Sequence, residues 1–247
     1  MSERPAFATV ILDVDSTVSG IEGIDWLAKR RGDIVAHRVA TLTNDAMRGA
    51  VPLDEVYAAR LAAIRPRRNE LDELSAAYVA ALAPNCVETI ARLRRAGVHV
   101  VLVSSGLRHA LIRLALQLGV ELGDLHAVDI RFDAGGAYAG FDTMSPLTTA
   151  DGKRALIAAL PLERPILMLG DGATDLAARD VVDRFVAFTG FVTRDAVVKQ
   201  AKTAVASFDE LAELVLPTRT SPSSSSTSPP DVSSRSPSPS PFLREAP

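Results

Sequence analysis

The sequence predicts an α/β fold, a doubly wound parallel sheet of the Rossmann-like kind with an inserted helical segment. Short apolar runs of strand length recur at residues 7–12, 99–103, 165–169 and 184–188. Helical stretches such as 87–96 and 108–118 separate these runs, and this alternation is typical of parallel sheets covered by helices on both faces. The connection between the first two runs is far longer than one crossover requires, which predicts an insertion.

The insertion is expected to be a helical cap domain over residues 18–83. Its pattern indicates four helices, at 24–31, 34–48, 53–64 and 70–82. A lid at this place would exclude water from a site at the strand ends. A second, smaller insertion is predicted at 128–141, where Asp133-Ala134-Gly135-Gly136 lies between alternating residues and indicates a β-hairpin.

Composition sets the domain organisation and excludes several classes of protein. Residues 217–247 are dominated by Ser and Pro, so a disordered tail is expected there, with the catalytic core at 1–17 and 84–216. The net charge is −3, which argues against a nucleic-acid binder, and no apolar run is long enough to span a membrane. The single cysteine, Cys86, fits a reducing compartment, so the cytoplasm is the expected location.

Polar clusters follow or lie between the predicted strands, and these carry the chemistry. They are residues 13–17, 104–106, Lys153 and 170–175. Because the carboxyl ends of parallel strands meet at one edge of the sheet, these clusters are expected to converge. Converging carboxylates repel one another and need a cation, and oxygen ligands favour Mg²⁺. With charge neutralised, an aspartate can attack a phosphate monoester and form an acyl phosphate.

Each cluster taken alone has a simpler explanation. An isolated Asp-x-Asp motif or a Ser-Ser pair is often a loop or helix cap, and a single lysine is usually solvated. Gly170-x-Gly172-x-x-Asp175 partly matches a dinucleotide-binding fingerprint, but the third glycine is missing and no N-terminal βαβ unit carries the motif. The signal becomes specific only because all four clusters occur in a fixed order relative to the strands.

That order resembles the haloacid dehalogenase-like phosphatases, and within them the phosphoserine phosphatase family. The resemblance covers about residues 7–214, and the strings that carry it are 13–18, 22–25, 46–52, 60–61 and 170–175. It implies hydrolysis of O-phospho-L-serine to L-serine and phosphate, the last step of serine biosynthesis, with Mg²⁺ as cofactor. The expected partner is this small molecule, with neither nucleic acid nor membrane, and the chain is expected to be a monomer or a homodimer.

The resemblance also implies a role for each candidate residue. Asp13 is similar to the family's nucleophile, and Asp15 to its general acid and base. Metal ligands would be Asp13, the backbone carbonyl of Asp15 and Asp171, supported by Asp175. The phosphoryl group and the substrate would be held by the remaining members of the site, namely Lys153, Ser104, Ser105, Gly106, Thr174, Met47, Glu22 for the ammonium and Arg60 for the carboxylate.

Arg60 has an independent argument from periodicity. Arg60 falls within an apolar helix face, where an arginine needs an anion. That face is marked by Leu53, Val56, Tyr57, Leu61 and Ile64. The simpler alternative is that the Arg60 side chain extends outward to solvent.

Two departures from the family's pattern concern the fit of the substrate. Ser105 replaces a usual glycine, so a Cβ restricts the backbone beside the phosphate, and Leu53 stands where an aromatic residue is common. Alternative functions are a phosphatase or phosphotransferase for another small phosphomonoester or for homoserine, and an inactive phosphoserine-binding module.

Overall fold

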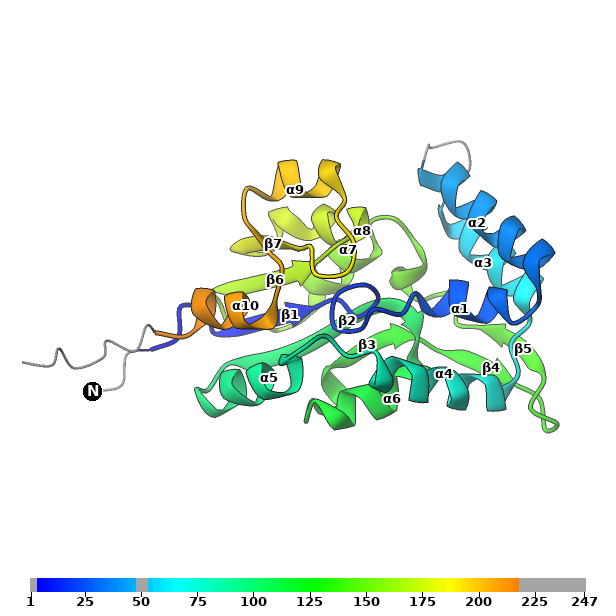
Figure 1. The fold of residues 1–247 in the computed structure, drawn as a ribbon, viewed down its shortest axis with the longest axis horizontal. Helices are drawn as coiled ribbons and strands as arrows, with labels where there is room; N and C mark the ends of the chain where they lie inside the picture. Colours follow the sequence, from blue (N-terminus) through cyan, green and yellow to red (C-terminus); the bar gives the residue numbers. More distant parts are fainter. Residues whose placement is uncertain (1–3, 48–52, 218–247) are drawn as a thin grey trace, which may run out of the picture. The chain divides into compact units, whose positions relative to one another are not determined.

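The computed structural model describes residues 4–47 and 53–217, and a six-stranded parallel sheet forms its centre (Figure 1). The strand order is β3-β2-β1-β6-β7-β8. This architecture confirms the predicted α/β class. The strands are β1 (Thr9–Leu12), β2 (His99–Leu107), β3 (Leu125–Val128), β6 (Ile166–Gly170), β7 (Arg184–Phe188) and β8 (Ala204–Val205).

Strand β1 lies inside the sheet, and every one of its residues is buried. It pairs in parallel with β2 on one side and with β6 on the other, so that Val10 faces both Val100 and Leu167. Strands covered on both faces require continuous rather than alternating apolar sequence, which is the pattern of these runs. The four predicted strands are present, whereas β3 and β8 were not predicted.

Helices cover both faces of the sheet, as a doubly wound topology requires. In Figure 1, one group lies above the sheet and the other below it. The first group is α7 (Gly152–Ala159), α8 (Ala173–Ala177) and α9 (Asp195–Ala201). The second is α5 (Cys86–Arg95) and α6 (Arg108–Gln117), with α10 (Phe208–Val215) packed against α5. Short 3-10 turns complete the connections at Leu122–Asp124, Pro146–Thr148 and Ala178–Asp180.

Four helices follow β1, as the sequence predicts. They are α1 (Gly23–Lys29), α2 (Asp33–Met47), α3 (Leu53–Ile64) and α4 (Arg68–Ala80). Helices α1 to α3 pack on one another beyond the carboxyl ends of the strands, whereas α4 lies along α6 (Figure 1). The inserted segment therefore has one helix anchored on a helix that covers the sheet.

A single arginine joins three of these helices. Arg31, just after α1, donates from Nε to the Ile64 carbonyl at the end of α3, at 2.8 Å. Its two terminal nitrogens bond both carboxylate oxygens of Glu70 in α4. Such a bidentate pair holds both partners in a defined relative orientation.

The predicted hairpin is also present. Strands β4 (Ile130–Phe132) and β5 (Tyr138–Phe141) are antiparallel, and Gly136 in their turn has a φ of 77°, which glycine adopts without strain. The Phe141 ring packs edge-on against Tyr57 of α3, with centroids 5.3 Å apart. The hairpin therefore packs against the inserted helices through this pair of rings.

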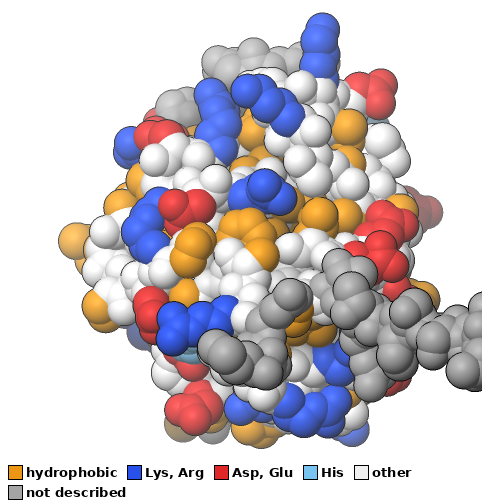
Figure 2. Space-filling view, turned by 90° about the vertical axis from the view of Figure 1, so that its left-hand side faces the viewer, with side chains coloured by type: hydrophobic (Ala, Val, Ile, Leu, Met, Phe, Trp, Pro, Cys, Tyr) orange, Lys and Arg blue, Asp and Glu red, His pale blue; other side chains and the backbone are white. Residues whose placement is uncertain are grey.

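One face of the molecule carries side chains of both charge signs, in keeping with the net charge of −3. Figure 2 shows the side near the amino ends of the strands, where cationic and anionic side chains occur among apolar ones. Within residues 4–47 and 53–217, no helix combines the length and the apolar character that crossing a bilayer demands.

Candidate active site

Most of the predicted residues meet at the carboxyl edge of the sheet, around one cavity of about 420 Å³. Asp13 follows β1, Ser104 lies within β2, and Asp171 follows β6. Residues of the inserted helices and of the sheet edge line the cavity together, including Glu22, Tyr57, Arg60, Lys153 and Thr174. The topology thus brings together side chains as far apart in the sequence as Asp13 and Thr174, as the strand-end argument predicts.

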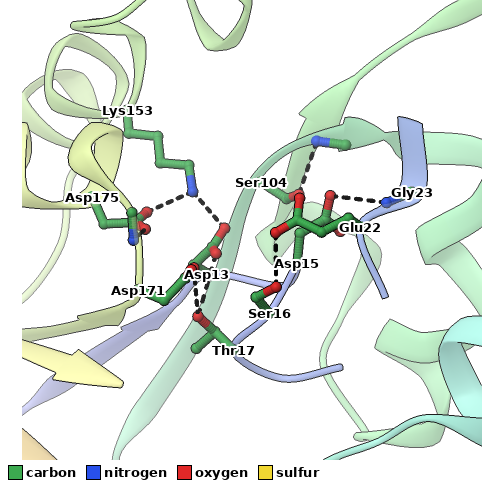
Figure 3. A network of polar contacts seen from close by, with 12 residues as sticks. Asp13, Asp15, Ser16, Thr17, Glu22, Gly23, Ser104, Lys153, Asp171 and Asp175 are labelled. Atoms are coloured by element: carbon green, nitrogen blue, oxygen red, sulfur yellow. Dashed lines mark hydrogen bonds and ion pairs between the residues drawn. The ribbon is translucent and has the colours of Figure 1, made fainter. Parts of the chain in front are cut away.

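Asp13 and Lys153 form the centre of the site, and both are buried (Figure 3). The Lys153 ammonium donates to Asp13 Oδ1 and, at 2.6 Å, to Asp175 Oδ1. Burial alone would lower the pKa of Lys153, but the charges of Asp13 and Asp175 outweigh it and raise that pKa. Lys153 is therefore a permanent cation beside the carboxylate that follows β1.

Three carboxylates at this point form a set that suits a metal ion. Oxygen atoms of Asp13, Asp171 and Asp175 lie within 4.8 Å of one another. Burial raises the pKa of Asp171 to about 6, and Asp175 adds to this shift while Arg194 opposes it. Burial also raises the pKa of Asp13. Carboxylate oxygens that converge with fewer positive than negative charges nearby can bind a hard divalent cation.

Asp15 lies in different surroundings from Asp13. The Tyr78 hydroxyl donates to Asp15 Oδ1 at 2.5 Å, and the Gly23 N–H donates to Oδ2 at 3.3 Å. Burial raises the pKa of Asp15 to about 7, and the charge of Glu22 adds to this shift while the two hydrogen bonds oppose it. A carboxyl group with a pKa near neutrality can both give and take a proton under physiological conditions.

The loop at the end of β2 contributes backbone and hydroxyl groups. Ser104 is fully buried, and its Oγ accepts from the Gly106 N–H at 2.9 Å. Ser105 does not adopt a positive φ, so its Cβ causes no backbone strain. The departure from glycine noted in the sequence is therefore accommodated by this loop.

The inserted helices place two opposite charges at the cavity. Glu22 accepts from the Ser16 hydroxyl at 2.7 Å (Figure 3). Arg60 donates from one terminal nitrogen to Asp25 at 2.8 Å, while its buried Nε has no hydrogen-bond partner among the described residues. Val56, Tyr57, Leu61 and Ile64 are buried, as the periodicity predicts. Met47 is the last residue of α2, and its side chain, like that of Leu53, lies outside the described part.

The sequence argument missed Arg194 and Tyr78 and assigned no role to Thr17. Arg194, before α9, donates to Asp171 at 2.9 Å and lies 3.5 Å from Glu22. The Thr17 hydroxyl lies 3.4 Å from carboxylate oxygens of both Asp13 and Asp171. Thr17 belongs to a string already singled out, whereas Arg194 and Tyr78 belong to no motif and only the folded chain brings them to the site.

Comparison with protein families agrees with this geometry. The model of the haloacid dehalogenase-like hydrolases matches residues 7–179. That range includes strands β1, β2, β3 and β6, the aspartates after β1 and β6, and the lysine between them. The chain belongs to the haloacid dehalogenase-like hydrolases.

Its relatives define the family more narrowly. Over 205 residues the chain is 38% identical to phosphoserine phosphatase of Mus musculus, covering 82% of this chain and 90% of the relative. It is 34% identical to the chloroplastic phosphoserine phosphatase of Arabidopsis thaliana, covering 82% and 70% respectively. These similarities place it in the phosphoserine phosphatase family. A phosphoserine phosphohydrolase-like protein from Francisella tularensis shares the fold, with a TM-score of 0.72 at 22% identity, over 83% of this chain and 98% of that one.

Proposed function

We propose that this protein is a metal-dependent phosphatase that hydrolyses O-phospho-L-serine to L-serine and phosphate. The observation that supports it is a single cavity lined by two kinds of group. Asp13, Lys153 and Asp171 are suited to phosphoryl transfer, while Glu22 and Arg60 are opposite charges suited to an amino acid. The ammonium and carboxylate of phosphoserine would match that second pair.

In the first half of the reaction, an Asp13 oxygen attacks phosphorus while the bond from phosphorus to the serine oxygen breaks. Asp15 gives its proton to that oxygen, because an unprotonated alkoxide is a poor leaving group. Lys153 and Ser104 hold the transferring group. The product of this step is an aspartyl phosphate on Asp13 and free serine.

In the second half, water attacks the phosphorus of the aspartyl phosphate. Asp15, now ionised, takes a proton from that water, and the bond to Asp13 breaks to release phosphate. Asp13, Asp171 and Asp175 would hold the divalent cation, together with the backbone carbonyl of Asp15. When bound, it neutralises charge that otherwise repels the phosphate.

The metal and the location are finer parts of this proposal. Mg²⁺ is the proposed ion because the cluster offers carboxylate oxygens and contains neither histidine nor cysteine. A cytoplasmic location is proposed because the single cysteine, Cys86, is buried and free within the described fold.

The test compares phosphoserine with phosphoethanolamine, which lacks the carboxylate. Wild type is expected to prefer phosphoserine by on the order of 2–4 kcal/mol in transition-state binding, since a buried charge left without a partner costs about that much. This corresponds to about 30- to 1,000-fold in kcat/KM. Arg60→Ala should reduce the ratio of kcat/KM for phosphoserine to kcat/KM for phosphoethanolamine.

Arg30→Ala is the matched control, because Arg30 is another arginine next to α1 that pairs with Glu73 and does not line the cavity. It should leave the ratio of the two kcat/KM values unchanged. If Arg60→Ala also leaves that ratio unchanged, Arg60 does not recognise the carboxylate, and the assignment of phosphoserine loses its support.

A further inference from the structure

We propose that Tyr78 is a positioning residue for the reaction, and that it holds the Asp15 carboxyl group where it can protonate the leaving oxygen. The inference rests on the proposed function, in which Asp15 is the acid and base. Tyr78 comes from α4, 63 positions along the chain from Asp15, and belongs to none of the motifs. The Tyr78 hydroxyl nevertheless donates a hydrogen bond to Asp15 Oδ1.

The two donors to Asp15 fix the orientation of its carboxyl group. Tyr78 bonds Oδ1 and the Gly23 N–H bonds Oδ2, so that rotation of the group would break one bond or the other. Tyr78 is fully buried, and water therefore does not compete for its hydroxyl. A group that is held in position before reaction avoids the cost of orienting it during the reaction.

The backbone around the hydroxyl leaves it a defined space. A Cβ at residue 23 would lie 2.1 Å from Tyr78 Oη, a separation that real atoms do not adopt. At residue 106 it would lie 3.5 Å from the same oxygen, in ordinary contact. Gly23 thus has two functions, because it supplies the second donor to Asp15 and lets the tyrosine reach the first oxygen.

The backbone of Tyr78 is also fixed relative to the loop that follows Asp15. The Ser19 hydroxyl donates to the Tyr78 carbonyl at 2.9 Å, and α4 packs chiefly along α6 and to a smaller extent on α1. The contact between Tyr78 and Asp15 therefore depends on an anchored helix. It does not require any particular position of α2 and α3.

The chemical consequence depends on the leaving group. The serine oxygen must receive a proton from Asp15 as its bond to phosphorus breaks, whereas p-nitrophenolate leaves as a stable anion and needs no proton. A residue that acts by positioning Asp15 should therefore affect phosphoserine much more than p-nitrophenyl phosphate in the first half of the reaction. A residue that only supports the fold should affect both.

The experiment measures aspartyl-phosphate formation in single turnovers of the full chain with Mg²⁺. Tyr78→Phe is expected to slow the reaction of phosphoserine about tenfold or more, as part of the 10²- to 10⁴-fold that general acid–base catalysis supplies. The rate with p-nitrophenyl phosphate should change by less than about twofold, since that leaving group needs no acid. Equal slowing of both esters would overturn the proposal.

A double-mutant cycle gives an independent readout that uses phosphoserine alone. On an Asp15→Asn background, Tyr78→Phe should slow the reaction of phosphoserine only slightly further, because the two residues act as one unit. If Tyr78→Phe slows the reaction by the same factor on that background as in the wild-type protein, the proposal is also overturned.

Tyr57→Phe is the matched control. It removes another buried hydroxyl of the inserted helices, which donates to the Ser105 carbonyl at 2.9 Å, and it should change both esters by the same factor. A thermal melt checks that each variant is folded. If wild type does not release phosphate from phosphoserine, the proposed function fails. If wild type does so and Tyr78→Phe equals wild type, the role of Tyr78 alone is wrong.

Discussion

Asp13 and Asp15 are separated by one residue, yet their carboxyl groups have different neighbours. Asp13 faces Lys153 and the other carboxylates after β6, whereas Asp15 is surrounded by uncharged donors and Glu22. Successive residues of an extended segment alternate in direction, but i and i+2 point the same way, so a bend after β1 must separate the two. Ser16, with a φ of 53°, lies in the turn that continues after Asp15. The difference in surroundings supports different roles for the pair.

A dependence on pH follows from Asp15. Burial raises its pKa to about 7, so the protonated form that the first half-reaction needs is lost as pH rises through that value. We expect kcat/KM for phosphoserine to fall by up to tenfold per pH unit above about 7. Rates from pH 5.5 to 9 would measure this. A profile that stays flat to pH 9 would contradict Asp15 as the acid.

At the residue scale, the site residues that could be predicted from the sequence are those at the ends of predicted strands. Asp13, Ser104 and Asp171 could be found because each follows or ends an apolar run. Tyr78 could not, because a tyrosine on the apolar face of a helix has the same pattern whether or not its hydroxyl reaches a site. Arg194 could not, because nothing in its spacing indicates that its loop lies near Glu22.

At the scale of elements, one glycine determines how α1 and α4 approach each other. Gly23 begins α1, and its hydrogen atom faces the Tyr78 hydroxyl. Gly23→Ala should lower stability by about 1–3 kcal/mol through overpacking. For a chain of this length, that corresponds to a fall in Tm of roughly 2–12 °C. Calorimetry of the full chain would measure it.

Gly123→Ala is the control for this change. Gly123 has open space where a Cβ would lie and is absent from the residues with positive φ. Its Tm should stay within about 2 °C of wild type, as expected for a surface change of under 0.5 kcal/mol. A Gly23→Ala protein as stable as this control would show that α4 yields easily, contrary to its packing.

The predictability of the elements follows from their length and burial. Helix α3 begins and ends where its apolar face predicts, and β7 does so because it is a continuous buried run. Strand β3 contains a histidine and is only four residues long, and β8 has two residues, so neither carries a pattern. The packing of α4 along α6 depends on tertiary contacts, and the periodicity of either helix does not predict it.

At the scale of the whole molecule, the active site sets how stability responds to pH and metal. The pKa of Asp13 and that of Asp171 are raised by burial, the latter to about 6. A raised carboxyl pKa gives stability that is fully present below the unfolded value near 4, and is lost as pH rises through the folded value. The metal-free protein should therefore lose stability between about pH 4 and 6 through Asp171.

Metal binding should reverse this loss, because it favours the ionised carboxylates. At 100 times Kd, a ligand stabilises a fold by about 2.7 kcal/mol, or roughly 5–10 °C in Tm for a chain of this size. The gain from Mg²⁺ should be larger at pH 8 than at pH 5. Asp171→Asn should lose most of it. An equal gain at both pH values, or in Asp171→Asn, would contradict the assigned site.

The Arg31 contacts have a mechanical consequence for the cavity. Helix α2 begins next to Arg31 and α3 ends at it, so both helices extend away from the point where α1, α3 and α4 are joined. A rotation of α2 and α3 about the Ile64 carbonyl moves that carbonyl little and so keeps its bond to Arg31, whereas a translation of α3 breaks this bond. With 15 residues, α2 forms a lever about 22 Å long, and a rotation of about 10° would displace its far end by about 4 Å. Thr43, which lines the cavity near that end, would therefore move several times further than Ile64 beside the pivot.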